Sequence, residues 1–185
     1  MMEKNKAIFL DRDGTINIDR HYLYKTEEFE LLPGVAEAIK SINALGYLAI
    51  VVTNQPVIAR GEVTVKQLEE IHNKMETLLG QKGAYIDALY YCPHHPDKGF
   101  IGEIPELKCD CMCRKPKPGL LLKAVNDFNI DLNQSWMIGD SSNDIGAGNS
   151  AGCKTVLIGS GDYGQNLSAD CLFDVVDIIL KQTRL

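Results

Sequence analysis

Residues 7–15 read AIFLDRDGT: four apolar residues, Ala7 to Leu10, lead directly into Asp11, Asp13 and a Gly-Thr pair. A short apolar run without polar alternation is typical of a strand buried on both faces of a parallel sheet. Similar runs recur at residues 48–52, 135–138 and 155–158. These runs predict a set of central, buried strands.

Helical spacing occupies the intervals between these runs. Apolar residues three and four apart over 35–45 form one stripe, and Gly46 follows as the expected C-terminal stop. Residues 64–67 have the spacing of a capping box, and Pro118 suits the first turn of another helix. Alternating strands and helices predict an α/β fold with a doubly wound parallel sheet and right-handed crossovers, in a single domain over residues 1–185.

Polar motifs stand at the ends of the predicted strands. The run at 7–10 ends in DRDGT, the run at 48–52 in TNQ, and the run at 135–138 in GDSSND, whereas RKPKPG precedes a helix. Doubly wound sheets bind ligands at the carboxyl ends of their strands. The sequence therefore predicts a functional site at this edge of the sheet.

The carboxylates of this edge indicate a divalent cation. Asp11 and Asp13 project the same way if the chain stays extended, and Asp140 follows a neighbouring strand. Close carboxylates repel unless a cation intervenes, and Mg²⁺ suits one or two carboxylates plus a phosphate. One Asp can attack phosphorus and the second can act as general acid and base. Two solvated loop aspartates would be the simpler reading of an isolated Asp-x-Asp.

The remaining motifs supply groups that hold phosphate. Thr53 and Asn54 offer a hydroxyl and backbone N–H groups, although both residues are also common in ordinary turns. Lys115 can neutralise a phosphoryl group in transfer, and Arg114 can bind a second anion through two N–H groups. Without the neighbouring motifs these two cations would read as a solvated basic turn.

The composition of the chain argues against several classes of function. The net charge is −6, which argues against general binding to nucleic acid or an anionic membrane. No apolar run approaches the ~20 residues of a membrane span, and the apolar start at 7–10 is too short for a signal peptide. We expect a cytoplasmic protein, acting as a monomer on a small molecule.

The ordered motifs DRDGT, VTNQ, RKPKPG and GDSSND resemble those of the haloacid dehalogenase (HAD) superfamily of phosphohydrolases, over roughly residues 6–158. This resemblance implies Asp11 as nucleophile, Asp13 as general acid and base, and Thr53 and Lys115 as phosphoryl stabilisers. It also implies that Asp11, the backbone carbonyl of Asp13, and Asp140 hold Mg²⁺. Only short segments separate the first two strands, so we expect no large cap domain.

A cluster of cysteines predicts a second metal site, because a reducing compartment disfavours disulfides. Two Cys-x-Cys pairs overlap between residues 109 and 113, and CPHHP begins at Cys92. The pair next to Arg114 fits the pattern CxCRKP. We therefore expect a structural, four-ligand Zn²⁺ site in a zinc loop (residues 92–113). The predicted ligands are Cys92, His94, Cys111 and Cys113.

The other candidates for metal or thiol chemistry receive simpler interpretations. Cys109 is left out of the predicted zinc site, and His95 is expected at the surface or behind a ligand. Cys153 and Cys171 are expected to be small buried apolar side chains.

The zinc loop resembles the branch of the superfamily that contains heptose 1,7-bisphosphate and histidinol-phosphate phosphatases. CPHHP, IARGEVT and DRDGTINID are closer to the heptose enzymes, which remove the 7-phosphate and supply heptose for lipopolysaccharide and surface glycans. The resemblance implies that Arg114 binds the phosphate that stays on the sugar. It implies further substrate contacts from Asp19, Arg20, His21, Tyr22, Asn54, Gln55 and Pro56.

The chain departs from the heptose pattern at two places. Pro56 and Val57 replace a small hydroxyl residue and a glycine, and Ser141 stands where lysine is frequent. Proline removes a backbone N–H, which changes what this turn can offer a phosphate. Histidinol phosphate is therefore kept as an alternative substrate. Receiver-like phosphoacceptors form an alternative outside the enzymes, and a zinc-stabilised interaction module without catalysis forms another.

Overall fold

The computed structural model describes residues 4–183 of the chain, so the ends of the expected domain, 1 and 185, lie outside the described residues. One six-stranded sheet with the order β3-β2-β1-β4-β5-β6 forms the centre, and every pairing in it is parallel. The strands are β1 (Ala7–Leu10), β2 (Leu48–Asn54), β3 (Ala88–Cys92), β4 (Trp136–Gly139), β5 (Lys154–Ile158) and β6 (Leu167–Ala169).

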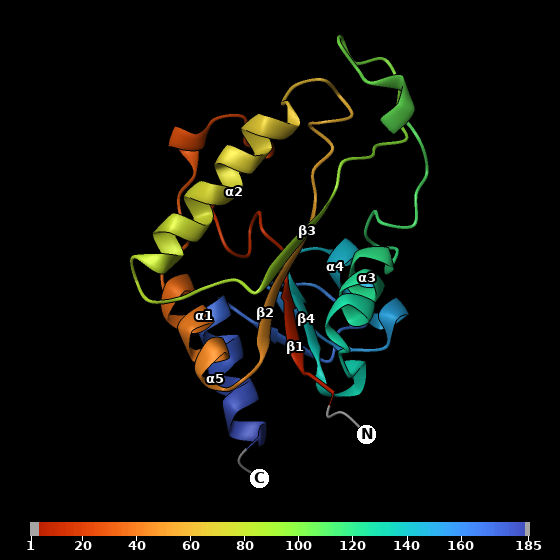
Figure 1. Ribbon diagram of the computed structural model, residues 1–185. Helices are drawn as coiled ribbons and strands as arrows, with labels where there is room; N and C mark the ends of the chain where they lie inside the picture. The colour runs from red at the N-terminus through yellow and green to blue at the C-terminus, as the bar shows by residue number, and fades with distance from the viewer. Residues whose placement is uncertain (1–3, 184–185) are drawn as a thin grey trace.

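Helices cover both faces of this sheet, as Figure 1 shows. Side chains of α1, α2 and α5 pack in one apolar cluster, and side chains of α3 and α4 pack in a second. β1 contributes side chains to both clusters: Ile8 and Leu10 belong to the first, and Ala7 and Phe9 belong to the second. Successive side chains of a strand point to opposite faces of the sheet. The helices are α1 (Val35–Ala44), α2 (Val65–Gly80), α3 (Gly119–Phe128), α4 (Ser142–Ala151) and α5 (Leu172–Thr183); η1 (Thr26–Glu28), η2 (Pro105–Leu107) and η3 (Leu132–Gln134) are short 3-10 helices.

The predicted α/β fold with a doubly wound parallel sheet is confirmed. The four apolar runs correspond to β1, β2, β4 and β5, with ends shifted by one or two residues. The edge strands β3 and β6 were not expected. Most of their residues are only partly buried. β6 has only three residues, with Ser168 at its centre, and β3 contains two tyrosines, whereas the expected central strands are rich in aliphatic and β-branched residues.

The expected helix boundaries are largely present. Thr64 and Gln67 form a reciprocal capping box at the start of α2. Gly46 follows α1 with a φ of 70°, a conformation that glycine adopts without steric cost. Pro118 is the N-cap of α3 rather than a residue of its first turn. No helix among residues 4–183 is both long enough and apolar enough to span a membrane.

The sheet order places β1 beside β4, where the chain changes direction across the sheet. Ligands bind in such sheets at the carboxyl ends of the strands on either side of this reversal. Between β1 and β2 the chain forms only η1 and α1, so no cap domain is inserted there, as expected. The cleft above β1 and β4 is therefore bordered by short segments, among them Arg114 and Lys115, which directly follow the zinc loop.

Candidate active site

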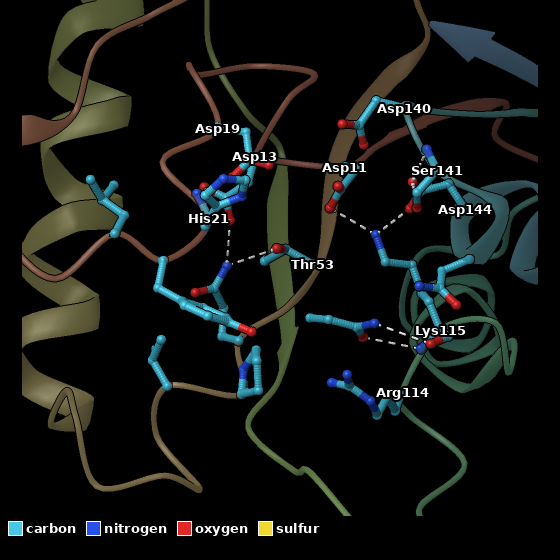
Figure 2. A pocket seen from close by; sticks show the side chains of 17 residues that line it. Asp11, Asp13, Asp19, His21, Thr53, Arg114, Lys115, Asp140, Ser141 and Asp144 are labelled. Carbon is cyan, nitrogen blue, oxygen red and sulfur yellow. Dashed lines mark hydrogen bonds and ion pairs between the residues drawn. The ribbon is translucent and has the colours of Figure 1, made fainter. Parts of the chain in front are cut away.

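Three carboxylates meet at the carboxyl ends of β1 and β4. Asp11 directly follows β1, Asp140 directly follows β4, and Asp144 lies in the first turn of α4. One carboxylate oxygen from each lies within 4.8 Å of the others. Figure 2 shows the three side chains converging on one side of the cleft. Three negative groups at this separation form a site for a positive ion.

Gly14 allows the loop after β1 to approach Asp140. Its φ is 81°, in the left-handed region, and a Cβ at this position would overlap the Asp140 carboxylate. Glycine thus meets two separate requirements of the motif DRDGT: the turn of the chain and the space for the carboxylate.

Lys115 is the cation within this acidic group. Its Nζ lies 2.7 Å from Asp11 Oδ1 and 2.5 Å from Asp144 Oδ1, and its side chain is 2% exposed. Nζ also donates to the carbonyl oxygen of Val52 at the end of β2, at 2.7 Å. All three directions of the ammonium group are therefore occupied, and the charge is held between two strands and α4.

The charges of the site favour a further cation. Burial, opposed by Lys115 and reinforced by Asp144, raises the pKa of Asp11 to about 7. Burial and the neighbouring Asp144 raise the pKa of Asp140 to about 6. Three carboxylates against one ammonium leave negative charge uncompensated at neutral pH, and oxygen ligands of this kind suit a hard divalent ion such as Mg²⁺. The residues present therefore fit the predicted ion.

Asp13 lines the same cleft but is not one of the three grouped carboxylates. Its carboxylate accepts hydrogen bonds from Arg12 (2.8 and 2.9 Å), from Asn17 (2.9 Å) and from Gln55 (2.9 Å). Burial alone would raise its pKa, but the Arg12 guanidinium and these hydrogen bonds outweigh burial and lower it. The expectation that Asp11 and Asp13 project the same way required an extended chain, and the chain instead turns at residues 12–17. Both residues line the cleft, but only Asp11 belongs to the group of three carboxylates.

The motif after β2 contributes to the walls of the cleft. Thr53 is buried, and its hydroxyl accepts a hydrogen bond from Gln55 Nε2 at 2.9 Å. Asn54 exchanges two hydrogen bonds with the backbone of Lys115, at 3.0 and 3.1 Å. Its side chain therefore holds the RKPKPG motif against β2.

A cleft of about 270 Å³ brings most of the predicted substrate residues together. Arg20 is the exception: it does not line the cleft, and its guanidinium pairs at the surface with Glu30 at 3.4 Å. Arg114 faces the cleft and donates to the carbonyl oxygen of His94 at 3.3 Å. The predicted residues that do line the cleft are Asp11, Asp13, Asp19, His21, Tyr22, Thr53, Asn54, Gln55, Pro56, Arg114, Lys115 and Asp140.

The predicted zinc ligands form one group. One ligand atom from each of Cys92, His94, Cys111 and Cys113 lies within 4.8 Å of the others. The Sγ atoms are 3.2–3.5 Å apart, and His94 Nδ1 is 3.3 Å from Cys113 Sγ. A tetrahedral site with Zn–S bonds of about 2.3 Å needs ligand atoms at roughly this spacing. The four residues therefore fit a closed, structural Zn²⁺ site, and the exposed Cys109 is not one of the group.

The surroundings of His95, Cys171 and Cys153 test the remaining expectations. His95 is 6% exposed, and its Nε2 lies 3.3 Å from Arg60 Nη2, so a surface position is excluded, whereas the other expected position, behind the ligand His94, agrees with its burial. Cys171 is only partly buried and donates to Asp174 at 3.1 Å. Cys153 is buried, as expected.

Three residues of the site were not singled out from the sequence. Asp144 belongs to the motif GDSSND, and its place three residues after Ser141 is the capping-box spacing that α4 shows. Arg12 is fully buried beside Asp13, and His72 on α2 contacts it. The capping spacing could have identified Asp144, whereas no local pattern connects His72 with Arg12, 60 residues earlier.

Comparisons with known proteins agree with this site. The HAD-hydrolase-like family model matches residues 112–176. The D-glycero-beta-D-manno-heptose-1,7-bisphosphate 7-phosphatase of Pasteurella multocida is 46% identical over 158 residues, which cover 84% of this chain and 83% of that protein. The protein of the same name from Haemophilus influenzae is 40% identical over 188 residues, which cover 97% and 99%.

A solved structure extends the comparison. The D,D-heptose 1,7-bisphosphate phosphatase from B. bronchiseptica, complexed with magnesium and phosphate, superposes with a TM-score of 0.82 at 32% identity, covering 96% of this chain and 99% of that chain. On these similarities, the chain belongs to the D-glycero-beta-D-manno-heptose-1,7-bisphosphate 7-phosphatase family of HAD-like hydrolases.

Proposed function

We propose that the protein is a Mg²⁺-dependent phosphatase that removes the 7-phosphate of D-glycero-β-D-manno-heptose 1,7-bisphosphate. The observation that carries this proposal is the Asp11–Asp140–Asp144 group around Lys115, in a chain whose relatives bear this activity in their names. The 1-phosphate stays on the sugar.

Asp11 is the proposed nucleophile. Its carboxylate attacks phosphorus, the bond from phosphorus to the sugar oxygen breaks, and a phosphoryl group is left on the aspartate. Asp13 protonates the leaving sugar oxygen and then removes a proton from the water that hydrolyses the aspartyl-phosphate. Arg12 holds Asp13 ionised and turned toward itself in the free protein. To act as the acid, Asp13 must therefore take up a proton from solvent when the dianionic phosphate binds, and rotate about its side-chain bonds toward the leaving oxygen.

Lys115 and Thr53 stabilise the transferred group. The Lys115 ammonium is already at the Asp11 carboxylate, so it lies beside the phosphoryl group that Asp11 accepts and can neutralise the oxygens of that group during transfer. Thr53 is the next-to-last residue of β2, at the same edge of the sheet, and its hydroxyl can donate to a phosphoryl oxygen.

Mg²⁺ would be held by Asp11, Asp140 and the backbone carbonyl of Asp13, with Asp144 close to the same group. When bound, it offsets the charge between the nucleophile and the incoming phosphate. Zn²⁺ on Cys92, His94, Cys111 and Cys113 would have a structural role, because four protein ligands leave no open position. Thiolate ligands of this kind are kept reduced in the cytoplasm, where we propose that the protein acts.

Arg114 is the proposed ligand of the 1-phosphate. It lines the same cleft as Lys115, donates to the carbonyl oxygen of His94, and forms no ion pair with a carboxylate within residues 4–183. A guanidinium can bind a phosphate through two parallel N–H groups. Asp19, His21 and Tyr22 border the cleft and would contact the sugar.

Phosphate release from the β and α anomers of heptose 1,7-bisphosphate, and from histidinol phosphate, tests the substrate. We expect the highest kcat/KM for the β anomer, a ³¹P spectrum that retains the anomeric phosphate, and loss of turnover on chelation of Mg²⁺. Asp11→Asn should reduce turnover to background. Equal or faster hydrolysis of histidinol phosphate would contradict the substrate, and a retained rate in Asp11→Asn would contradict the nucleophile.

A further inference from the structure

Arg12 lies between the two aspartates of DRDGT and is fully buried. Its Nη2 donates to both carboxylate oxygens of Asp13, at 2.8 and 2.9 Å, and its Nε lies 3.2 Å from Oδ1. Such a two-point contact fixes the guanidinium plane relative to the carboxylate. The position of Asp13 therefore depends on the position of Arg12.

The other end of the guanidinium is held by His72, a residue of α2 that does not line the cleft. Arg12 Nη1 lies 3.1 Å from His72 Nε2. Because a guanidinium only donates, His72 must present an unprotonated Nε2 to it. Burial and the Arg12 charge lower the pKa of His72 to about 3, so the ring is neutral near neutral pH.

The His72 ring is itself held in place. It is 7% exposed and packs at 5.8 Å, between ring centroids, against Tyr91 of β3. The contact therefore connects α2 and β3 with the loop that follows β1. Buried hydrogen-bonded side chains of this kind restrict each other to one geometry.

We propose that His72 is a positioning residue for Asp13 and acts through Arg12. This inference rests on the proposed role of Asp13 as general acid and base. Without the acceptor at His72, the guanidinium has a buried donor with no partner and can turn toward other acceptors, which moves the carboxylate of Asp13 from its place. A misplaced acid lowers the rate of the chemical step and leaves substrate binding unchanged.

Comparing two substrates with different leaving groups distinguishes a positioning role of His72 from a general loss of folded structure. Phenolate is a poorer leaving group than p-nitrophenolate, so its departure depends more on protonation by Asp13. The test uses single-turnover release of the two phenols from phenyl phosphate and p-nitrophenyl phosphate with Mg²⁺. Neither compound is a sugar, so this comparison stays informative if heptose bisphosphate proves not to be the substrate.

For His72→Leu we expect a roughly 10- to 100-fold loss of rate on phenyl phosphate, a much smaller loss on p-nitrophenyl phosphate, and a KM for each within about twofold of that of the unmodified protein. His72→Gln, whose amide oxygen can replace Nε2 as acceptor, should recover most of the rate. If His72→Leu does not fold, His72→Asn is used with the same expectation, because its shorter side chain does not reach Nη1.

Met75→Ala is the matched control, since Met75 is a fully buried residue of the same helix that does not line the cleft. It should lower the melting temperature and leave both single-turnover rates unchanged. Equal loss on both aryl phosphates, unchanged rates in His72→Leu, or no recovery in His72→Gln would each overturn the proposal. Absence of turnover of heptose bisphosphate by the unmodified protein would instead refute the proposed function alone.

Discussion

Replacing Lys115 with methionine removes the cation between Asp11 and Asp144 and keeps a side chain of similar length. The lysine is 2% exposed and lies 2.5–2.7 Å from both carboxylates. Breaking a buried ion pair by removing one partner costs about 3–5 kcal/mol, because the remaining charge stays buried. Since about 1 kcal/mol shifts Tm by about 2–4 °C at this chain length, we expect Tm to fall by about 6–20 °C in chelator.

The fall in Tm that Lys115→Met causes should depend on the Mg²⁺ concentration and on the pH. A divalent ion among the carboxylates replaces part of the missing charge, so saturating Mg²⁺ should narrow the difference in Tm between variant and unmodified protein. The pKa of Asp11 is about 7 in the folded protein, above its ordinary value of 3.8, so the folded state holds this proton more tightly than the unfolded state. Stability from this proton is fully present below about pH 4 and is lost as the pH rises through 7. The difference between Lys115→Met and the unmodified protein should therefore be small near pH 4 and largest above pH 7.

Lys117→Met is the matched control for this experiment. Lys117 is two residues away and pairs with Asp110 at 2.6 Å, but its side chain is 36% exposed. Exposed pairs contribute roughly 0–1 kcal/mol, so its Tm should change by only a few degrees. Thermal unfolding monitored by circular dichroism, with EDTA and with Mg²⁺, measures both variants. If Lys115→Met unfolds at the same temperature as Lys117→Met in EDTA, the reasoning about the buried charges is refuted.

Three further predictions follow from the same structure. Gly14→Ala should displace the Asp140 carboxylate and raise the Mg²⁺ concentration for half-maximal activity by roughly tenfold or more, measured by Mg²⁺ titration; an unchanged titration would contradict the close approach of the loop to Asp140. Cys111→Ser should leave the purified protein with much less than one zinc per chain by elemental analysis, and a full complement of zinc would exclude Cys111 as a ligand. Arg60→Met removes a guanidinium that stacks on Tyr22 at 4.4 Å and should raise KM for the sugar bisphosphate by several-fold without changing kcat for p-nitrophenyl phosphate; an equal KM for the sugar would argue against a role of this contact in substrate binding.

Patterns in the sequence predicted the features of the structure that depend on residues close together in the chain. The apolar runs at β1, β2, β4 and β5 are buried on both faces, and such strands carry their signal in consecutive residues. The motifs at the ends of β1, β2 and β4 could be assigned to one edge of the sheet, because parallel strands align their carboxyl ends. The spacing of the thiols and His94 likewise predicted which side chains gather around the zinc loop.

Other features required the tertiary structure. β3 and β6 border the sheet and are only partly buried. Ser168 interrupts the short β6, and β3 carries two tyrosines in place of the aliphatic residues of the central strands, so neither was identified as a strand. The chain turns at residues 12–17, and the Asp13 carboxylate pairs with Arg12 rather than joining the group of Asp11, Asp140 and Asp144. A turn of this kind is not visible in the spacing of two aspartates.

The contacts of Lys115 and of Arg12 join residues that are far apart in the chain. Lys115 meets Asp11, which precedes it by 104 residues, and Arg12 meets His72, 60 residues later. A sequence determines the chemical character of each of these side chains and the strand or helix that carries it. The packing of those elements decides which buried charge faces which partner, because burial removes water as the competing partner and leaves only the nearest protein group.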